Sequence, residues 1–448
     1  MPNRNTLLTI LLGALLGVPA FAQVPYTLVG MGDSIGEGVQ SADASYRTQP
    51  NTYLKLIANQ MGVSFPLPLI LDGPTTTIES VTGRTRINPN ALSANLAVSG
   101  ASVDSMLNQM AGQPVTTEAD LVLEPRTGTQ MQIAQSLKAP MTICWIGNND
   151  VLGAILAWNQ LDASQMTPLA AFQSDYATIT ADLKAASAAV VMATIPDVTE
   201  IGYVVSPQDL QLFLGNSYGL PQGSFTTVPT MLLIKLGLLP PTILQNPNYV
   251  LDPTEIAAIE QRRQQFNQII KSDAAAAGFA VADIAGLFQQ YQQNPPVFDG
   301  LALSTRFNGG LFSLDGVHPS DIGHALAANA FIAAANQQYG FKIPPISKAN
   351  LLKIAEADPF LDWDQDLVVA GRPFAGLLET LGPKVGISGD LNDKPPASAA
   401  AASSGSKINP AAGQAFMQQY FALKGLNKTS WTEADAIAAM QDVFSKLL

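Results

Sequence analysis

The chain has 448 residues, enough for one large catalytic domain with a smaller module or for two ordinary domains. Charged residues make up 13% of it, against about 25% in typical soluble domains, and the net charge is −12. This balance argues against binding nucleic acid or anionic lipid through charge. The single cysteine, Cys144, excludes an internal disulfide framework. The chain has two histidines, His318 and His324, so any imidazole base must be one of them.

The N-terminus reads as a secretory signal. Arg4 supplies the positive start, residues 7–18 form a short apolar run, and Ala20-Phe21-Ala22 fits a small-x-small cleavage site. The run is shorter than the roughly 20 residues of a spanning helix. We therefore expect residues 1–22 to be removed on export to the periplasm or beyond, with a buried N-terminal helix as the weaker alternative.

Apolar segments that end in glycine, proline or polar clusters predict five buried strands. They cover residues 26–31, 94–98, 141–146, 189–195 and 279–283. Helical patterns alternate with them, at 51–61, 102–110, 172–186, 252–277 and from 318 to about 339. The alternation predicts an α/β fold in which helices cover both faces of a parallel sheet of about five strands. Such sheets place their chemistry at the carboxyl ends of the strands.

Two stretches fall outside this alternation. Residues 199–250 are rich in Leu, Pro, Gly and Met, which fits either a packed insertion or a lid that forms one wall of an acyl pocket and touches lipid or membrane. An extension covers 346–387, a Ser/Ala/Pro/Gly linker covers 388–409, and a helical segment covers 410–448. The sequence leaves three alternatives for that last segment: a docked helix pair, a membrane-proximal anchor or a lid.

The polar cluster after the first strand contains the candidate nucleophile. Ser34 lies in Gly32-Asp33-Ser34-Ile35-Gly36-Glu37-Gly38, a tight turn that exposes the serine and aims its N–H into the cleft. The segment also matches Gly-x-Ser-x-Gly, the nucleophile elbow of α/β-hydrolases. In those enzymes the serine follows several strands, whereas Ser34 follows the first, so we reject that assignment.

A serine nucleophile needs a base, and the base needs a carboxylate to fix its tautomer. Asp315 precedes His318 by three residues in a loop that enters a helix, which allows both roles within one turn. An isolated Asp-x-x-His is more often a turn and a helix cap. The scarcity of histidine favours the catalytic interpretation, because His324 falls inside a helical pattern, where we expect a packing or surface role.

Gly100 and Asn149 follow two other strands. A glycine N–H and an asparagine amide are suitable donors to a developing oxyanion. Taken alone, each is as well explained by an ordinary turn.

These four blocks, in this order, resemble the SGNH, or GDSL, hydrolase family. The matching residues are Gly32-Asp33-Ser34 with Gly36 and Gly38, then Gly100, then Gly147-Asn148-Asn149-Asp150, and finally Asp315-x-x-His318. The resemblance spans residues 24–339 and implies a three-layer α/β/α, flavodoxin-like hydrolase domain over residues 23–345.

The resemblance also implies roles for these residues in ester hydrolysis. Ser34 would be the nucleophile, His318 the base and then the acid, and Asp315 the residue that orients His318. The N–H groups of Ser34 and Gly100 and the side chain of Asn149 would form the oxyanion hole. No cofactor or metal is implied.

The substrate is less determined than the reaction. The apolar insertion and low charge favour lipid or acyl esters, with a glycan O-acetylesterase as the alternative. A non-catalytic binding module on the same fold is a second alternative. A metal-dependent hydrolase is the weakest, because two histidines six residues apart without nearby acids make a poor metal site.

Overall fold

The computed structural model describes residues 26–71, 84–365, 367, 369–371 and 408–444. The predicted signal at 1–22 and nearly all of the predicted linker at 388–409 lie outside these residues.

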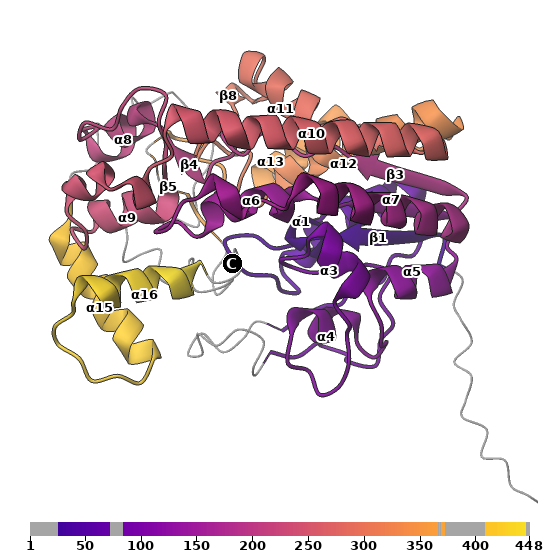
Figure 1. Ribbon diagram of the computed structural model, residues 1–448, viewed down its shortest axis with the longest axis horizontal. Helices are drawn as coiled ribbons and strands as arrows, with labels where there is room; N and C mark the ends of the chain where they lie inside the picture. The colour runs from indigo at the N-terminus through magenta and orange to yellow at the C-terminus, as the bar shows by residue number, and fades with distance from the viewer. Residues whose placement is uncertain (1–25, 72–83, 366, 368, 372–407, 445–448) are drawn as a thin grey trace, which may run out of the picture.

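A parallel sheet forms the centre of the molecule (Figure 1). Its four strands, in spatial order, are β1 (Leu28–Gly32), β2 (Met141–Trp145), β3 (Ala189–Ala193) and β6 (Ala280–Ala282). Apart from the middle residue of β6, every strand residue is buried, as expected for a sheet covered on both faces.

The predicted strand at 94–98 is not a strand of this sheet, so the expected count of about five is corrected to four. The segment runs beside β1 and makes one parallel bridge, Gly30 to Asn95. Backbone bonds join Ala94, Leu96 and Val98 to β1, but a second bridge would need the Gly32 N–H, which donates to Oε1 of Gln130 at 3.2 Å instead.

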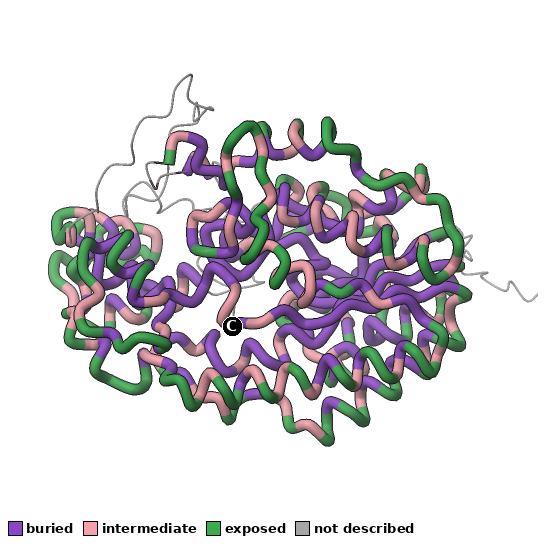
Figure 2. Tube along the Cα trace, turned by 90° about the horizontal axis from the view of Figure 1, so that it is seen from above, coloured by how far each residue is buried: buried purple, intermediate pink, exposed green. Residues whose placement is uncertain are grey.

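Helices form two layers around the sheet (Figure 1). One layer packs α2 (Tyr53–Met61) and α13 (Lys348–Ala357) against α12 (Asp321–Tyr339). The other packs α3 (Val103–Asn108), α5 (Gln130–Leu137) and α10 (Pro253–Ala277) against α7 (Leu169–Ala186). The helix predicted at 252–277 is confirmed as α10, which begins with a capping box formed by Asp252 and Glu255. Figure 2 shows the buried centre between the exposed outer faces of the helices.

Shorter elements connect these strands and helices within the described residues. They are α1 (Ser34–Glu37), η1 (Gln49–Asn51), α4 (Glu118–Leu123), α6 (Asn148–Leu156), η2 (Ala163–Gln165), α11 (Ile284–Gln293), β7 (Val297–Phe298) and β8 (Leu301–Ala302). Within 199–250 they are β4 (Val204–Val205), α8 (Pro207–Leu214), β5 (Thr226–Thr227), α9 (Val228–Lys235), η3 (Pro241–Gln245) and η4 (Pro247–Tyr249).

The apolar residues of the 199–250 insertion mostly face inward. Every residue of α9 is buried, and Leu212 is the one large apolar side chain of the insertion that is strongly exposed. Most of the insertion's apolar side chains are therefore packed inside the protein.

The C-terminal segment forms a helix pair that packs on the insertion. It consists of α15 (Pro410–Leu423) and α16 (Glu433–Val443), the latter starting at a capping box formed by Thr432 and Asp435. Asn409 N–H donates to the Lys235 carbonyl at 2.7 Å, and the rings of Tyr203 and Phe444 meet edge to face at 6.4 Å. Figure 1 shows the pair beside α9. In the part of the chain that the structure describes, no helix is long and apolar enough to cross a membrane.

Candidate active site

Ser34 is the first residue of α1, directly after β1. The Asp33 carboxylate caps this short helix by accepting the Ile35 N–H at 3.0 Å, and Gly38 ends it with a φ of 103°. That left-handed φ would strain any side chain, which explains the glycine. Ser34 itself is 7% exposed, so it lies at the base of an enclosed site.

Gly100 and Asn149 lie at the same edge of the sheet, where α1 begins. Ser99 N–H donates to Glu37 Oε2 at 2.6 Å, which ties the Gly100 loop to α1. Asn149 Nδ2 donates to the Ala101 carbonyl at 2.9 Å, which ties the same loop to α6. Since Nδ2 carries two hydrogens, this bond leaves the second one for another acceptor.

Asp150 fixes the loop from its other side. Its Oδ2 accepts the Val103 N–H at 3.1 Å and its Oδ1 accepts the Thr167 hydroxyl at 2.7 Å. Burial raises the pKa of Asp150 to about 6, although these bonds act to lower it. The last residue of the Gly-x-Asn-Asp block therefore braces the start of α3.

Asp315 and His318 form a buried pair on the loop before α12. Nδ1 of His318 lies 2.8 Å from Oδ2 of Asp315, and the residues are 1% and 0% exposed. The other ring nitrogen, Nε2, is buried and has no hydrogen-bond partner among the described residues. The Ser34 hydroxyl is therefore not hydrogen-bonded to this nitrogen in the structure.

Four donors surround the Asp315 carboxylate. Oδ1 accepts the N–H groups of Val317 and His318, each at 2.8 Å, while Oδ2 accepts the His318 ring and the Ala42 N–H, the latter at 2.6 Å. Burial acts to raise the pKa of Asp315, but the charge of His318 and these hydrogen bonds outweigh it and hold the pKa below its usual value. The ionised carboxylate is thus suited to hold the proton of His318 on Nδ1.

Asp33 is a second fully buried carboxyl group beside Ser34. Its Oδ2 accepts a hydrogen bond of 2.8 Å from Nδ2 of Asn148, the first residue of α6. Burial raises the pKa of Asp33 to about 6, against the lowering effect of the bonds from Asn148 and Ile35.

The two histidines have different surroundings. The Nδ1 atom of His324 accepts the Tyr53 N–H at 3.3 Å, and the two rings stack at 6.2 Å inside the helix layer. This is the packing role expected from the sequence. Among the described residues, no group of His, Cys, Asp and Glu side chains could hold a metal ion.

Sequence reasoning missed three contributors. Asn148 offered a signal, since it adjoins Asn149 in the same polar block. Ser313, whose hydroxyl accepts the Ser41 N–H at 2.8 Å, offered none, because it reads as a loop residue. Ala42 offered none either, because its contribution comes from a backbone N–H, which every residue except proline carries.

An apolar pocket opens beside Ser34 and His318. Its free space is about 30 Å³. The lining residues are Ile35, Trp145, Asn148, Leu152, Ile195, Pro196, Val198, Ile201, Phe288, Phe312, Val317 and Pro319. The neighbours of Ser34 and His318 in sequence thus line the pocket, and Ile201 brings the start of the insertion into its wall.

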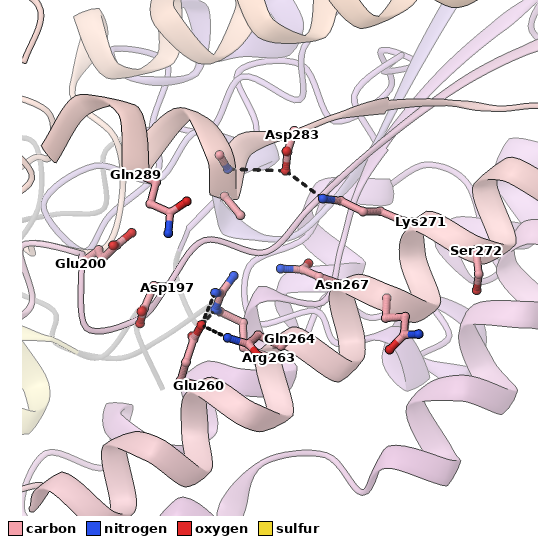
Figure 3. Close-up of a pocket in the computed structure, with 13 residues that line it drawn as sticks. Asp197, Glu200, Glu260, Arg263, Gln264, Asn267, Lys271, Ser272, Asp283 and Gln289 are labelled. Atoms are coloured by element: carbon pink, nitrogen blue, oxygen red, sulfur yellow. Dashed lines mark hydrogen bonds and ion pairs between the residues drawn. The ribbon is translucent and has the colours of Figure 1, made fainter. Parts of the chain in front are cut away.

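A larger hollow of about 650 Å³ lies between α10 and α11 and contains none of the predicted site residues (Figure 3). Its polar groups largely bond one another: Arg263 makes two 2.6 Å bonds to Glu260, and Lys271 lies 3.4 Å from Asp283. Burial and the neighbouring Asp197 raise the pKa of Glu200 to about 7. We take the smaller pocket as the candidate site, because Ile35, Val317 and Pro319, the sequence neighbours of Ser34 and His318, line it.

Comparison with known proteins gives a family match. Residues 28–331 match the model of the GDSL-like lipase/acylhydrolase family, which is more than half of the chain. No curated protein matches the sequence.

Solved structures give distant likenesses. The α/β hydrolase LAE5 from the metagenome of Lake Arreo, Spain, is 16% identical with a TM-score of 0.37, over 69% of this chain and 95% of that one. The acetylxylan esterase Axe2 from Geobacillus stearothermophilus is 14% identical with a TM-score of 0.36, over 71% and 95%. At these scores neither protein bears on what this chain acts on. On the strength of the family match, the chain belongs to the GDSL-like lipase/acylhydrolase family.

Proposed function

We propose that this chain hydrolyses carboxylic esters through an acyl-enzyme on Ser34. The observation that carries the proposal is the buried Asp315–His318 pair, in which Nδ1 is engaged at 2.8 Å and Nε2 is left without a partner among the described residues. A histidine held in this way is ready to accept a proton on Nε2.

In the proposed reaction, Ser34 Oγ attacks the ester carbonyl carbon while His318 Nε2 takes the hydroxyl proton. The tetrahedral oxyanion is stabilised by the N–H groups of Ser34 and Gly100 and by the second amide hydrogen of Asn149. The carbon–oxygen bond to the alcohol then breaks, and His318 gives its proton to the leaving alcohol. Water, deprotonated by His318, cleaves the acyl-enzyme and restores Ser34.

The apolar pocket is the proposed acyl site, which favours lipid or other acyl esters as substrates. Asn148 is the one polar residue in its wall. Its small volume supports the second candidate, a glycan O-acetylesterase, because about 30 Å³ holds roughly two water-sized groups. A longer acyl chain would require Phe288 and Phe312, whose rings meet at 5.7 Å, to move apart.

The test of the reaction is Ser34→Ala. We expect this variant to lose hydrolysis of p-nitrophenyl esters and labelling by a fluorophosphonate probe while its melting temperature is kept. Ser206→Ala, which removes a helix-capping hydroxyl on α8, is the matched control and should keep both activities. Full activity in Ser34→Ala would refute the proposal, and failure of the unmodified protein to label would revive the binding-module alternative.

The test of the acyl site is a chain-length profile. Ile201→Ala widens the wall that the insertion contributes, so we expect it to shift the preferred acyl chain toward longer esters. An unmodified protein that accepts only acetyl esters supports the glycan candidate. An unchanged profile in Ile201→Ala would place the acyl chain elsewhere.

The export signal and the localisation outside the cytoplasm remain part of the proposal. Fractionation of cells that express the full chain, with N-terminal sequencing of the exported product, tests for cleavage after Ala22.

A further inference from the structure

The loop after α1 contains a strained turn. Gln40 and Asp43 exchange both backbone hydrogen bonds, at 2.8 and 3.1 Å, across Ser41 and Ala42. These two residues have φ values of 54° and 62°. Positive φ at both central positions is the pattern of a type I′ turn, which normally takes Asn-Gly, and residues with a Cβ atom are disfavoured there. Such a conformation persists only where its surroundings impose it.

The surroundings of this turn are the Asp315–His318 loop. Ser41 N–H donates to the Ser313 hydroxyl at 2.8 Å, and Ala42 N–H donates to Asp315 Oδ2 at 2.6 Å. The left-handed backbone thus directs two successive N–H groups at the same loop. Both turn residues and both acceptors are buried, with Ser41 and Asp315 at 0% exposure.

Gln40 extends the contact past His318. Its Nε2 lies 3.1 Å from the Pro319 carbonyl and 3.0 Å from Asp321 Oδ1. The turn therefore contacts the loop on both sides of the histidine.

Arg84 holds the far side of the turn. Its guanidinium lies 3.2 Å from Asp43 and 3.2 Å from Glu118 at the start of α4, and it also donates to the Ala44 carbonyl. Arg84 is 8% exposed, so this bridge is shielded from solvent. Removal of Arg84 would leave the carboxylates of Asp43 and Glu118 without their shared cation, which is destabilising for buried charges.

We propose that the turn at residues 40–43 is the positioning element that orients the Asp315 carboxylate toward Nδ1 of His318. Arg84 holds one side of this turn, and the Ser313 hydroxyl accepts a hydrogen bond from the other. The inference rests on the proposed function for its kinetic consequence. Ser313 and Arg84 act through Asp315 and contact no reacting atom. Their removal should therefore lower kcat and leave substrate binding nearly unchanged.

The experiment compares the unmodified protein with Ser313→Ala, which removes the acceptor of Ser41 N–H, and with Arg84→Lys, which keeps the charge but cannot bridge Asp43 and Glu118 as a fork. Ser206→Ala on α8 is the control. For each we measure kcat and KM per fluorophosphonate-titrated site, the melting temperature, and the downfield proton NMR signal of the His318 Nδ1–H.

We expect Ser313→Ala to lower kcat by about 10- to 100-fold, as small misplacements of catalytic groups do, with KM within about threefold. Its downfield signal should shift or broaden. Arg84→Lys should show the same changes in smaller measure, and supplies the test if Ser313→Ala does not fold. Ser206→Ala should lose stability only.

Unchanged kcat per site together with an unchanged downfield signal in a folded variant would overturn the positioning role. A fall in activity that disappears on correction for titrated sites would overturn it too, because it reports only unfolded protein. If the unmodified protein has no esterase activity but its downfield signal still responds to Ser313→Ala, the proposed function fails and the positioning role stands.

Discussion

Nδ2 of Asn148 lies 2.8 Å from Oδ2 of Asp33, and both residues are buried. This bond joins the residue before Ser34 to the residue before Asn149. It therefore sets the distance between two loops that follow different strands of the sheet. A carboxyl group is the acceptor, although burial raises its pKa to about 6.

This raised pKa predicts a pH-dependent stability. The folded protein binds the Asp33 proton more tightly than the unfolded chain, whose value is 3.8. The protonated Asp33 carboxyl group therefore contributes fully to the stability of the folded protein below pH 3.8, and this contribution is lost as the pH rises through about 6. About two pKa units correspond to about 3 kcal/mol in the free energy of unfolding.

Asp33→Asn should remove this loss of stability at higher pH, because asparagine does not ionise. Asparagine still caps α1, and Asn148 can turn its amide so that Oδ1, which has no partner among the described residues, accepts the new donor. We expect melting temperatures to show a gain over the unmodified protein that is larger at about pH 7.5 than at about pH 4.5. The exposed Asp104→Asn serves as control, and an equal gain at both pH values would contradict the prediction.

Asn149→Ala should reveal whether that amide acts on the oxyanion. Loss of one such donor lowers kcat by about 10²- to 10³-fold with little change in KM. The matched control is Asn329→Ala, which removes another amide that donates to a carbonyl, that of Ile346 at 3.1 Å. Steady-state kinetics on both variants should show that only the first loses turnover. Equal kcat values would reduce Asn149 to a brace for the Ala101 carbonyl.

Gly316→Ala should separate backbone strain from the contact between the insertion and the Asp315 loop. Gly316 has a φ of 73°, and a Cβ there would lie 2.5 Å from Tyr203 N and 2.6 Å from the Gly202 carbonyl carbon. Gly62, at the end of α2, has a similar φ of 66° with open space around its Cβ position.

Gly62→Ala should therefore lose about 1 kcal/mol of stability from its left-handed φ alone and keep full activity. Gly316→Ala should lose more stability and most of its turnover, because the loop that carries Asp315 must move away from the insertion. Melting curves and kcat for the two variants provide the comparison. Equal losses of stability and unchanged kcat in both variants would mean that Gly202 and Tyr203 shift to make room for the Cβ atom without disturbing the site.

The sequence was informative where chemistry is tied to residue type. The helical pattern at residues 252–277 predicted α10, and the aspartate three residues before His318 distinguished that histidine from His324. The predicted strand at 94–98 was wrong, because its apolar pattern does not reveal that the Gly32 N–H of β1 donates to the Gln130 side chain rather than to this segment.

The positioning turn illustrates a second limit of sequence. Ser41 and Ala42 are poor residues for a type I′ turn, so local propensity argues against the conformation that they adopt. Tertiary contacts with Ser313 and Asp315 impose it. Those contacts span more than 270 residues of sequence, beyond the range of any local pattern.

Gly413→Ala should test whether the C-terminal helix pair depends on its contact with the insertion. Gly413 lies within α15, where a Cβ atom would run into the Leu236 carbonyl oxygen. In an isolated helix, glycine to alanine is stabilising by about 1 kcal/mol. A loss of stability would therefore report the contact rather than the helix. We expect a lower melting temperature and faster proteolysis within residues 408–444, whereas Gln414→Ala, an exposed change on the same helix, should have neither effect. A higher melting temperature in Gly413→Ala would show that α15 gains its stability without the insertion.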